Sequence, residues 1–199
     1  SRDYLERFGQ ALGVDFRYVA TPTWWQAQDM LQSGDVDLLT SLTKASARKR
    51  DFAFTPPYLS LQTAIFTRED VPYVGEVAEL RNRRVAVVPG YAMKEYLLSQ
   101  CPEMQLVDVK DVPAALRMLE DGSVDAFVGA LLITSHYIQA GGHTRIKVAG
   151  ETRFVYQPAF ACRPDWAILV QILDKALEGI AEDERNAIGR KWMAVTYEE

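Results

Sequence analysis

The sequence predicts an α/β protein built from two lobes that share one plan. Stretches with the apolar spacing of helices alternate with short apolar runs typical of strands along almost all of the 199 residues. This alternation is the pattern of α/β folds with parallel sheets. A ten-residue phrase also occurs twice, as MLQSGDVDLL at residues 30–39 and as MLEDGSVDAF at residues 118–127. Each copy ends a predicted helix and begins a predicted strand, so each lobe is expected to contain one helix-turn-strand unit.

The first lobe is predicted to begin with two helices, each followed by a strand. Apolar residues at helical spacing stop at Gly13 and again at Ser33-Gly34, and glycine commonly ends helices. Thr23 carries a side chain that favours a helix start. The apolar run after Gly34 is typical of a buried parallel strand. The predicted elements are a helix over residues 4–12, a strand over 16–20, a helix over 23–33 and a strand over 36–42.

The second lobe repeats this alternation around a turn at Pro89-Gly90. Apolar runs of strand length are again separated by stretches with helical spacing. The predicted elements are a strand over residues 84–88, a helix through Tyr96-Leu97, a strand over 106–109, a helix over 113–119 and a strand over 124–128.

Two strand-like segments, residues 63–67 and 154–162, flank this second group of elements. A helical apolar face follows them from Trp166 to Leu177, and a last helix is predicted from Glu182 to Trp192. The chain therefore returns to the first lobe after the second has been completed. The second lobe is expected to be an insertion into the first, with two crossings between them.

The expected borders follow from the two crossings. Lobe 1 comprises residues 1–67 and 156–199, and lobe 2 comprises residues 68–155. Hinges are usually a few residues at the ends of elements, which places them near Phe66-Thr67 and near Val155-Tyr156. A ligand is expected in the cleft where the strand ends of both lobes meet. The alternative is a pair of independent lobes packed rigidly together.

Composition excludes several classes of protein. With 48% apolar and 25% charged residues, the chain is an ordinary globular one. The net charge is −5 and no block is rich in Lys or Arg, so nucleic acid is not an expected partner. No apolar stretch approaches the roughly 18 to 20 residues of a membrane span, and Ser1-Arg2-Asp3 does not begin a signal peptide. Contact with a membrane is therefore expected only through segments outside this chain.

Cysteine and histidine give no sign of a metal site. Cys101 and Cys162 form no CxxC motif, and two free thiols are favoured over one disulfide. His136 and His143 are seven residues apart, with no cysteine or carboxylate at ligand spacing. No metal and no cofactor are expected.

Asp37 and Asp125 are the only sign of paired catalytic carboxylates. They occupy the same place in the two copies of the repeated phrase, directly after a glycine turn. Carboxylates in such a place are expected to accept hydrogen bonds from backbone amides, and this interpretation is favoured over acid-base catalysis. No phosphate loop or Gly-x-Ser-x-Gly motif is present. No catalytic residue is expected.

Several spaced motifs resemble one known family. These are SGDVDLLTSLTKASARKRDFAFTPPYL at residues 33–59, LRNRRVAVVPGYAMKEYL at 80–97 and GSVDAFVGA at 122–130. They resemble the signatures of the bacterial extracellular solute-binding proteins, family 3. The resemblance implies the periplasmic binding protein-like II fold, in which two α/β lobes are joined by two hinge crossings with a ligand cleft between. The first strand of the family and its Pro-rich ligand loop have no counterpart here, so a fragment of a longer domain is expected.

Three further stretches are most similar to the Venus-flytrap sensor domains of BvgS-type histidine kinases. They are ITSHYIQAGGHTRIKVAG, ACRPDW and IGRKWMAVTYE. The resemblance implies a periplasmic ligand-sensing domain of a membrane-bound signalling protein, and it leaves open a homodimer of the full-length protein. The alternative is a free periplasmic solute-binding protein of an ABC importer. A dehydratase-like enzyme of the same fold is the third hypothesis.

The resemblance assigns site residues position by position. Arg48 stands at the carboxylate-binding arginine of the family, and a planar guanidinium suits that role. Ser41 and Thr43 follow the strand and offer hydroxyl groups, and Gly90 stands at a turn before a helix, where backbone amides favour an anion. Each has a structural alternative: Arg48 could tie its own loop to a carbonyl, and the hydroxyl groups could satisfy local backbone.

Departures from the family pattern bear on the ligand. Ala45 and Ala47 replace the threonine and the acidic residue of the usual motif, and Tyr91-Ala92 stands where amino-acid binders have Ser or Thr. Ala130 replaces the carboxylate that pairs with the ammonium of an amino acid, and an unpaired buried ammonium is costly. A small anion or a carboxylate without a protonated α-amine is therefore the expected ligand. Tyr91 could contact such a ligand or simply fill the cleft.

Overall fold

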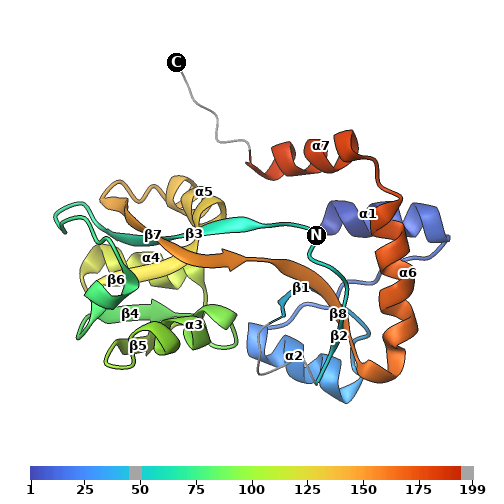
Figure 1. Cartoon of the computed structure of the whole chain (residues 1–199), viewed down its shortest axis with the longest axis horizontal. Coiled ribbons are helices and arrows are strands. Elements are labelled where there is room, and N and C mark those ends of the chain that lie inside the picture. Colours follow the sequence, from blue (N-terminus) through green and yellow to red (C-terminus); the bar gives the residue numbers. More distant parts are fainter. Residues whose placement is uncertain (45–50, 194–199) are drawn as a thin grey trace. The chain divides into compact units, whose positions relative to one another are not determined.

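The structure, a computed structural model, describes residues 1–44 and 51–193, with side chains as far as Gly189. These residues form two compact units (Figure 1). Unit 1 comprises Ser1–Pro22, Gln26–Leu59 and Gln157–Glu199, and unit 2 comprises Thr23–Trp25 and Ser60–Tyr156.

The chain leaves unit 1 after Leu59 and returns to it at Gln157. The sequence predicts the first border at residue 67, a few residues further along. The difference arises from β3 (Leu61–Arg68), which pairs with β6 on one side and with β7 on the other. Phe66 is fully buried within that sheet. Residues 66–67 therefore lie inside a sheet rather than at a crossing.

Unit 1 packs its helices against a small antiparallel sheet. The side chains of Phe8 in α1 and Phe160 in β8 are buried together, with ring centroids 5.3 Å apart. Leu173 and Leu177 of α6 complete this core. The strand order is β1-β8-β2, and both pairs are antiparallel. The elements are α1 (Arg2–Leu12), α2 (Trp24–Ser33, whose first two residues fall in unit 2), β1 (Leu39–Thr43), β2 (Ala53–Phe54), β8 (Pro158–Cys162), the 3-10 helix η3 (Pro164–Trp166), α6 (Ala167–Glu178) and α7 (Glu182–Met193).

Unit 2 is a five-stranded mixed sheet in the order β5-β4-β6-β3-β7. Strand β4 runs parallel to β5 and β6, whereas β3 runs antiparallel to β6 and β7. Side chains alternate between the two faces of the sheet, so neighbouring residues enter different cores. The further elements are the 3-10 helix η2 (Val77–Leu80), β4 (Arg84–Val87), α3 (Ala92–Gln100), β5 (Gln105–Asp108), α4 (Val112–Asp121), β6 (Ala126–Ala130), α5 (Leu131–Gly141) and β7 (Ile146–Tyr156).

The two cores of unit 2 lie on opposite faces of its sheet. Ile65 and Val85 pack on one face with η2 and with Leu97 of α3. Phe66 and Ala86, their neighbours in sequence, pack on the other face with Leu116 of α4 and other residues of α4 and α5. The sheet is therefore covered by helices on both sides, as expected for an α/β unit with parallel strands.

The repeated phrase forms the same helix-turn-strand unit in both units of the chain, as predicted. In unit 1, α2 ends at Gly34 and β1 follows; in unit 2, α4 ends at Gly122 and β6 follows. The φ angles of the two glycines are 88° and 83°, in the left-handed region that favours glycine. The sequence similarity thus reflects a shared backbone requirement.

The structure contradicts two of the predicted elements and contains a helix that was not among them. β1 is antiparallel to its neighbour β8, because an apolar run indicates burial but not the direction of the adjacent strand. Residues 16–20 pair with no strand in the described part of the chain, and of these residues only Phe16 is partly buried. The helix α5 was not predicted, since its first turns are apolar almost all round and lack a clear helical period.

Candidate functional site

Three helices of unit 2 begin at one edge of its sheet. Because β4, β5 and β6 are parallel, their carboxyl ends lie at the same edge. Gly90 and Tyr91 follow β4 and lead into α3, Asp111 precedes α4, and Ala130 lies between β6 and α5. Such an edge is where open α/β sheets bind ligands, and helix N-termini there favour anions. The structure therefore brings three predicted site residues, Gly90, Tyr91 and Ala130, to one edge.

Gly90 and Tyr91 form the turn that starts α3. Gly90 has a φ of 85°, and the amide of Tyr91 donates to the carbonyl of Val88 at 3.2 Å. The Tyr91 ring lies 6.2 Å from that of Trp24, centroid to centroid, in an edge-on arrangement within the same unit. Burial raises the pKa of the Tyr91 phenol, and the nearby Tyr137 and Asp111 raise it further. The phenol is thus a neutral group at neutral pH.

Ala130 contributes its backbone to this edge, and its methyl side chain carries no charge. It pairs with Thr63 of β3 and precedes the first turn of α5. Asp111 is a carboxylate at the same edge, but its Oδ1 accepts a hydrogen bond from the amide of Ala114 at 2.8 Å and so caps α4.

The predicted residues Ser41 and Thr43 of unit 1 lie within β1 (Leu39–Thr43), although the sequence predicts that they follow the strand. Tyr58 donates to the carbonyl of Thr40 at 2.8 Å, and its hydroxyl is also 2.8 Å from that of Ser41. Because a carbonyl only accepts, this geometry makes Ser41 the donor to Tyr58. The Ser41 hydroxyl is thus bonded to a side chain 17 residues away, and its role toward a ligand stays a prediction. Thr43 is partly buried and lies opposite Pro158 of β8.

Arg48 lies outside the described residues, together with Ala45 and Ala47. Its assignment as a ligand residue stays a prediction that rests on the sequence motif. The same holds for a joint site formed by Arg48, Ser41 and Thr43 with the residues of unit 2.

The raised pKa of Tyr58 predicts that the protein loses stability at alkaline pH. Burial is the main cause that raises its pKa from 10.0 to about 12. An acid whose pKa is raised by folding stabilises the protein below its unfolded pKa, and this stabilisation is lost as the pH rises from 10 to about 12. Tyr58→Phe should cost about 1 kcal/mol at pH 8, since Ser41 and Thr40 lose their partner. Urea titrations of both proteins should show this difference shrinking above pH 10; a difference that stays constant to pH 12 would count against it.

Asp125 is held by arginine and has a structural role. It accepts hydrogen bonds from the backbone amide of Arg84 at 2.8 Å and from both Nε and Nη2 of the same guanidinium. These bonds lower the pKa of the Asp125 carboxyl. The interpretation of Asp125 as a partner for backbone amides is confirmed, whereas Asp37 is exposed at the equivalent place in unit 1.

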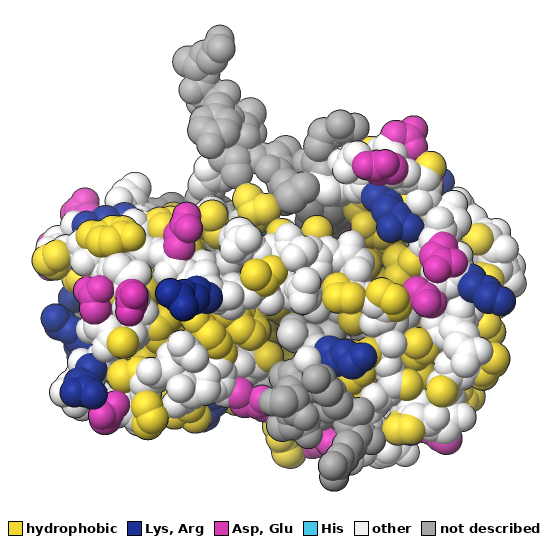
Figure 2. Space-filling model, in the orientation of Figure 1, with side chains coloured by type: hydrophobic (Ala, Val, Ile, Leu, Met, Phe, Trp, Pro, Cys, Tyr) yellow, Lys and Arg dark blue, Asp and Glu magenta, His cyan; other side chains and the backbone are white. Residues whose placement is uncertain are grey.

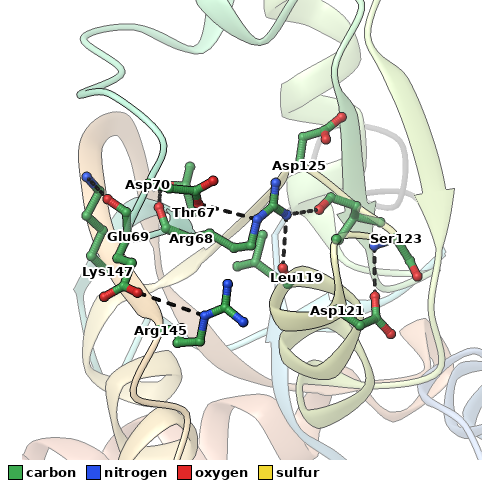
Figure 3. Close-up of polar contacts among 12 residues, drawn as sticks. Thr67, Arg68, Glu69, Asp70, Leu119, Asp121, Ser123, Asp125, Arg145 and Lys147 are labelled. Carbon is green, nitrogen blue, oxygen red and sulfur yellow. Dashed lines mark hydrogen bonds and ion pairs between the residues drawn. The ribbon is translucent and has the colours of Figure 1, made fainter.

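A second arginine fixes the same turn. Arg68 at the end of β3 donates through Nη1 to the carbonyls of Leu119 and Val124, both at 3.1 Å (Figure 3). It thereby satisfies a carbonyl in the last turn of α4, which has no partner within the helix. The second copy of the repeated phrase is therefore tied to β3 and β4 by two guanidinium groups.

The other polar residues give no metal centre. Cys101 and Cys162 are buried free thiols. His143 lies 2.6 Å from a carboxylate oxygen of Glu120. Within residues 1–44 and 51–193, no three potential metal-ligand side chains come together. Basic and acidic side chains are interspersed on the face seen in Figure 2.

Unit 1 also has an open groove of about 600 Å³. It is lined by residues of α1, α6 and α7, including Leu12, Ile172 and Glu184. None of the predicted site residues lines it.

Comparisons with known proteins identify the family. The model of the bacterial extracellular solute-binding proteins, family 3, matches residues 1–195. The chain belongs to this family. Among curated family members, the virulence sensor protein BvgS of Bordetella bronchiseptica is 27% identical over 195 residues, covering 96% of this chain and 15% of BvgS. The ABC transporter arginine-binding protein 1 of Escherichia coli is 24% identical over 139 residues, covering 68% of this chain and 56% of that protein.

Solved structures similar to this chain support the same assignment. A histidine kinase sensor domain with similarity to periplasmic binding proteins gives a TM-score of 0.90 at 26% identity, covering 97% of this chain and 85% of that domain. The periplasmic VFT2 domain of Bordetella pertussis BvgS gives 0.82 at 28% identity, covering 96% and 82%. The predicted fold class and the resemblance to Venus-flytrap sensor domains are confirmed. No helix in the described residues is long and apolar enough to cross a membrane.

Sequence reasoning missed several residues that shape this site. The Asp-x-Pro pattern at Asp111 is a recognisable helix start that could have been used. Tyr58 belongs to the quoted motif, yet nothing in the spacing shows that it bonds to Ser41. Tyr137 contributes to the raised pKa of Tyr91, but it belongs to α5, a helix that the sequence does not indicate.

Proposed function

We propose that this chain is the periplasmic ligand-sensing domain of a membrane-bound sensor histidine kinase. The observation that carries the proposal is the likeness over 97% of the chain to a histidine kinase sensor domain, at a TM-score of 0.90. The curated BvgS relative supports it, but the chain spans only 15% of BvgS. The kinase output is therefore a property proposed for the parent protein and not for this domain, whose role is binding.

The proposed ligand is a small anion or carboxylate that lacks a protonated α-amine. Arg48 would bind its charge, with help from Thr43 and from the amides that follow Gly90. Ala130 provides no carboxylate for an ammonium group. Asp108 and Asp111 are acidic side chains at the unit 2 edge. Each has an oxygen in a hydrogen bond: Asp108 Oδ1 accepts from Nζ of Lys94 at 2.6 Å, and Asp111 Oδ1 accepts from the amide of Ala114 at 2.8 Å.

Calorimetric titration with a panel of carboxylates and amino acids tests this proposal. We expect a carboxylate without an α-amine to bind, and Arg48→Ala to weaken binding at least about tenfold, because charge-assisted hydrogen bonds contribute roughly 1.5 to 3 kcal/mol. Arg50→Ala changes the same charge two residues away and is the matched control. Tight binding of a common amino acid, or equal affinity for Arg48→Ala and the parent chain, would refute the ligand assignment.

A free solute-binding protein of an ABC importer is the second candidate. The similarity to an arginine-binding protein of an ABC transporter favours it. The residues that follow Glu199 in the parent gene discriminate between the two. A linker leading into an apolar span of about 20 residues supports the sensor, and a stop codon supports the carrier.

A further inference from the structure

The last strand of unit 2 contains an irregularity immediately before the chain crosses to unit 1. Gln62 of β3 pairs with Val155 of β7, but Ala64 pairs with Glu151. Strand β3 therefore advances by two residues while β7 advances by four. The surplus residues form a bulge in β7 opposite Thr63, and such bulges commonly have a structural purpose.

A closed ring of hydrogen bonds holds this bulge. The Thr63 hydroxyl lies 2.6 Å from the carbonyl of Phe154 and 2.5 Å from the hydroxyl of Thr152, and the amide of Phe154 donates to Thr152 Oγ1 at 3.1 Å. Because the carbonyl only accepts, Thr63 must donate to it. Thr152 must then donate to Thr63. Each of the three donors is used once, and we name this arrangement the Thr63 ring.

The Thr63 ring is connected to two of the three predicted site residues of unit 2, Ala130 and Tyr91. Through its backbone, Thr63 pairs with Ala130 at the end of β6. The Phe154 ring packs against Tyr96 of α3, with centroids 5.0 Å apart, and α3 begins directly after Tyr91. Movement of Ala130 would therefore act on the bulge through its pairing with Thr63. Movement of Tyr91 would act on it through α3 and the contact of Tyr96 with Phe154.

The buried position of Thr63 gives the ring its strength. Thr63 is 1% exposed, so water cannot replace a lost partner. A buried hydroxyl or carbonyl left without a partner is costly, whereas a complete network is rigid. The bulge ends two residues before Tyr156, the last residue of unit 2.

From this geometry we infer that the Thr63 ring is a lock, meaning a hydrogen-bond network that restricts motion of the backbone at the crossing Tyr156-Gln157. It also couples this crossing to the edge of the unit 2 sheet where Tyr91 and Ala130 lie. The inference rests on the proposed sensing function for its biological meaning. Thr63 acts here as a positioning residue through its hydrogen bonds to the crossing strand β7.

Hydrogen exchange of the ligand-free chain tests the lock. In Thr63→Val, the amides of Phe154, Val155 and Tyr156 should exchange at least about tenfold faster, while the amides of β4 and β5 keep their rates. Thr63→Ser keeps the hydroxyl and should restore slow exchange.

Thr67→Val is the matched control. Thr67 lies on the same strand and is equally buried at 1% exposed, but among the described residues its hydroxyl donates to the adjacent Arg68 carbonyl and not to β7. It should leave exchange at the crossing unchanged. If Thr63→Val does not fold, Thr152→Ala opens the ring from its partly exposed side and serves instead. Unchanged exchange at residues 154–156, or acceleration spread equally over unit 2, overturns the inference. A chain that binds no ligand would refute the proposed function and leave this result intact.

Discussion

Gly150→Ala is expected to lower the free energy of unfolding by about 3 kcal/mol, the upper end of the usual cost of overpacking. A Cβ at Gly150 would lie 1.9 Å from the carbonyl oxygen of Val74. That oxygen belongs to the backbone, and the amide of Val74 is itself bonded to the carbonyl of Ala149 at 2.9 Å. Val74 cannot move away without breaking its bond to Ala149, and Gly150 cannot move away without disturbing its pairing with Ile65 of β3.

Urea unfolding followed by circular dichroism measures this effect. Gly179→Ala is the control, because a Cβ there would meet its neighbours at 3.5 Å or more, which is ordinary contact. We expect Gly179→Ala to change stability by less than about 0.5 kcal/mol. A loss below about 1 kcal/mol for Gly150→Ala would show that the approach of Val74 to β7 is looser than described.

Asp125→Asn is expected to cost about 2 kcal/mol at neutral pH. Asp125 accepts from the backbone and the guanidinium of Arg84, and charge-assisted bonds to a partly buried group contribute roughly this much. The lowered pKa of Asp125 determines how this stabilisation depends on pH. It is present above 3.8, the pKa in the unfolded chain, and is lost as the pH falls through the pKa in the folded chain. The difference in the free energy of unfolding between Asp125→Asn and the parent chain should therefore disappear at acidic pH.

The repeat supplies the matched control for this change. Asp37 has the same place in the first copy of the phrase but is exposed, so Asp37→Asn should cost less than about 0.5 kcal/mol. Urea unfolding of both variants between pH 3 and pH 7 makes the comparison. Equal losses for the two variants, or a loss for Asp125→Asn that does not depend on pH, would contradict the role assigned to Arg84.

The parts of the fold that could be predicted are those with a local signal. Glycine ends the helices at Gly13, Gly34 and Gly122, and in each case the left-handed φ explains why the signal is readable. The alternation of helix and strand predicts the fold class because it, too, is visible in short stretches of sequence. The direction of β1 depends on its partner β8, which follows more than a hundred residues later, so no local pattern contains it.

The candidate site was predictable to a similar degree. The turn at Gly90 and the end of β6 at Ala130 could be placed, because parallel strands bring their carboxyl ends to one edge. The partner of Ser41 could not, since Tyr58 reaches it from a separate segment. The bulge opposite Thr63 was equally invisible, because a register shift depends on both strands.

The most direct test of the sensing proposal is a distance measurement between the two units. Spin labels at Glu95→Cys in unit 2 and Glu178→Cys in unit 1 report on it, and the native Cys101 and Cys162 are buried. With the tightest carboxylate of the titration panel at saturation, we expect the distance distribution to shift, because in the proposed sensor the units would rotate about the crossings at Leu59-Ser60 and Tyr156-Gln157. Arg48→Ala should show no shift at the same concentration. An identical distribution with and without a carboxylate whose binding calorimetry has established would contradict the proposal.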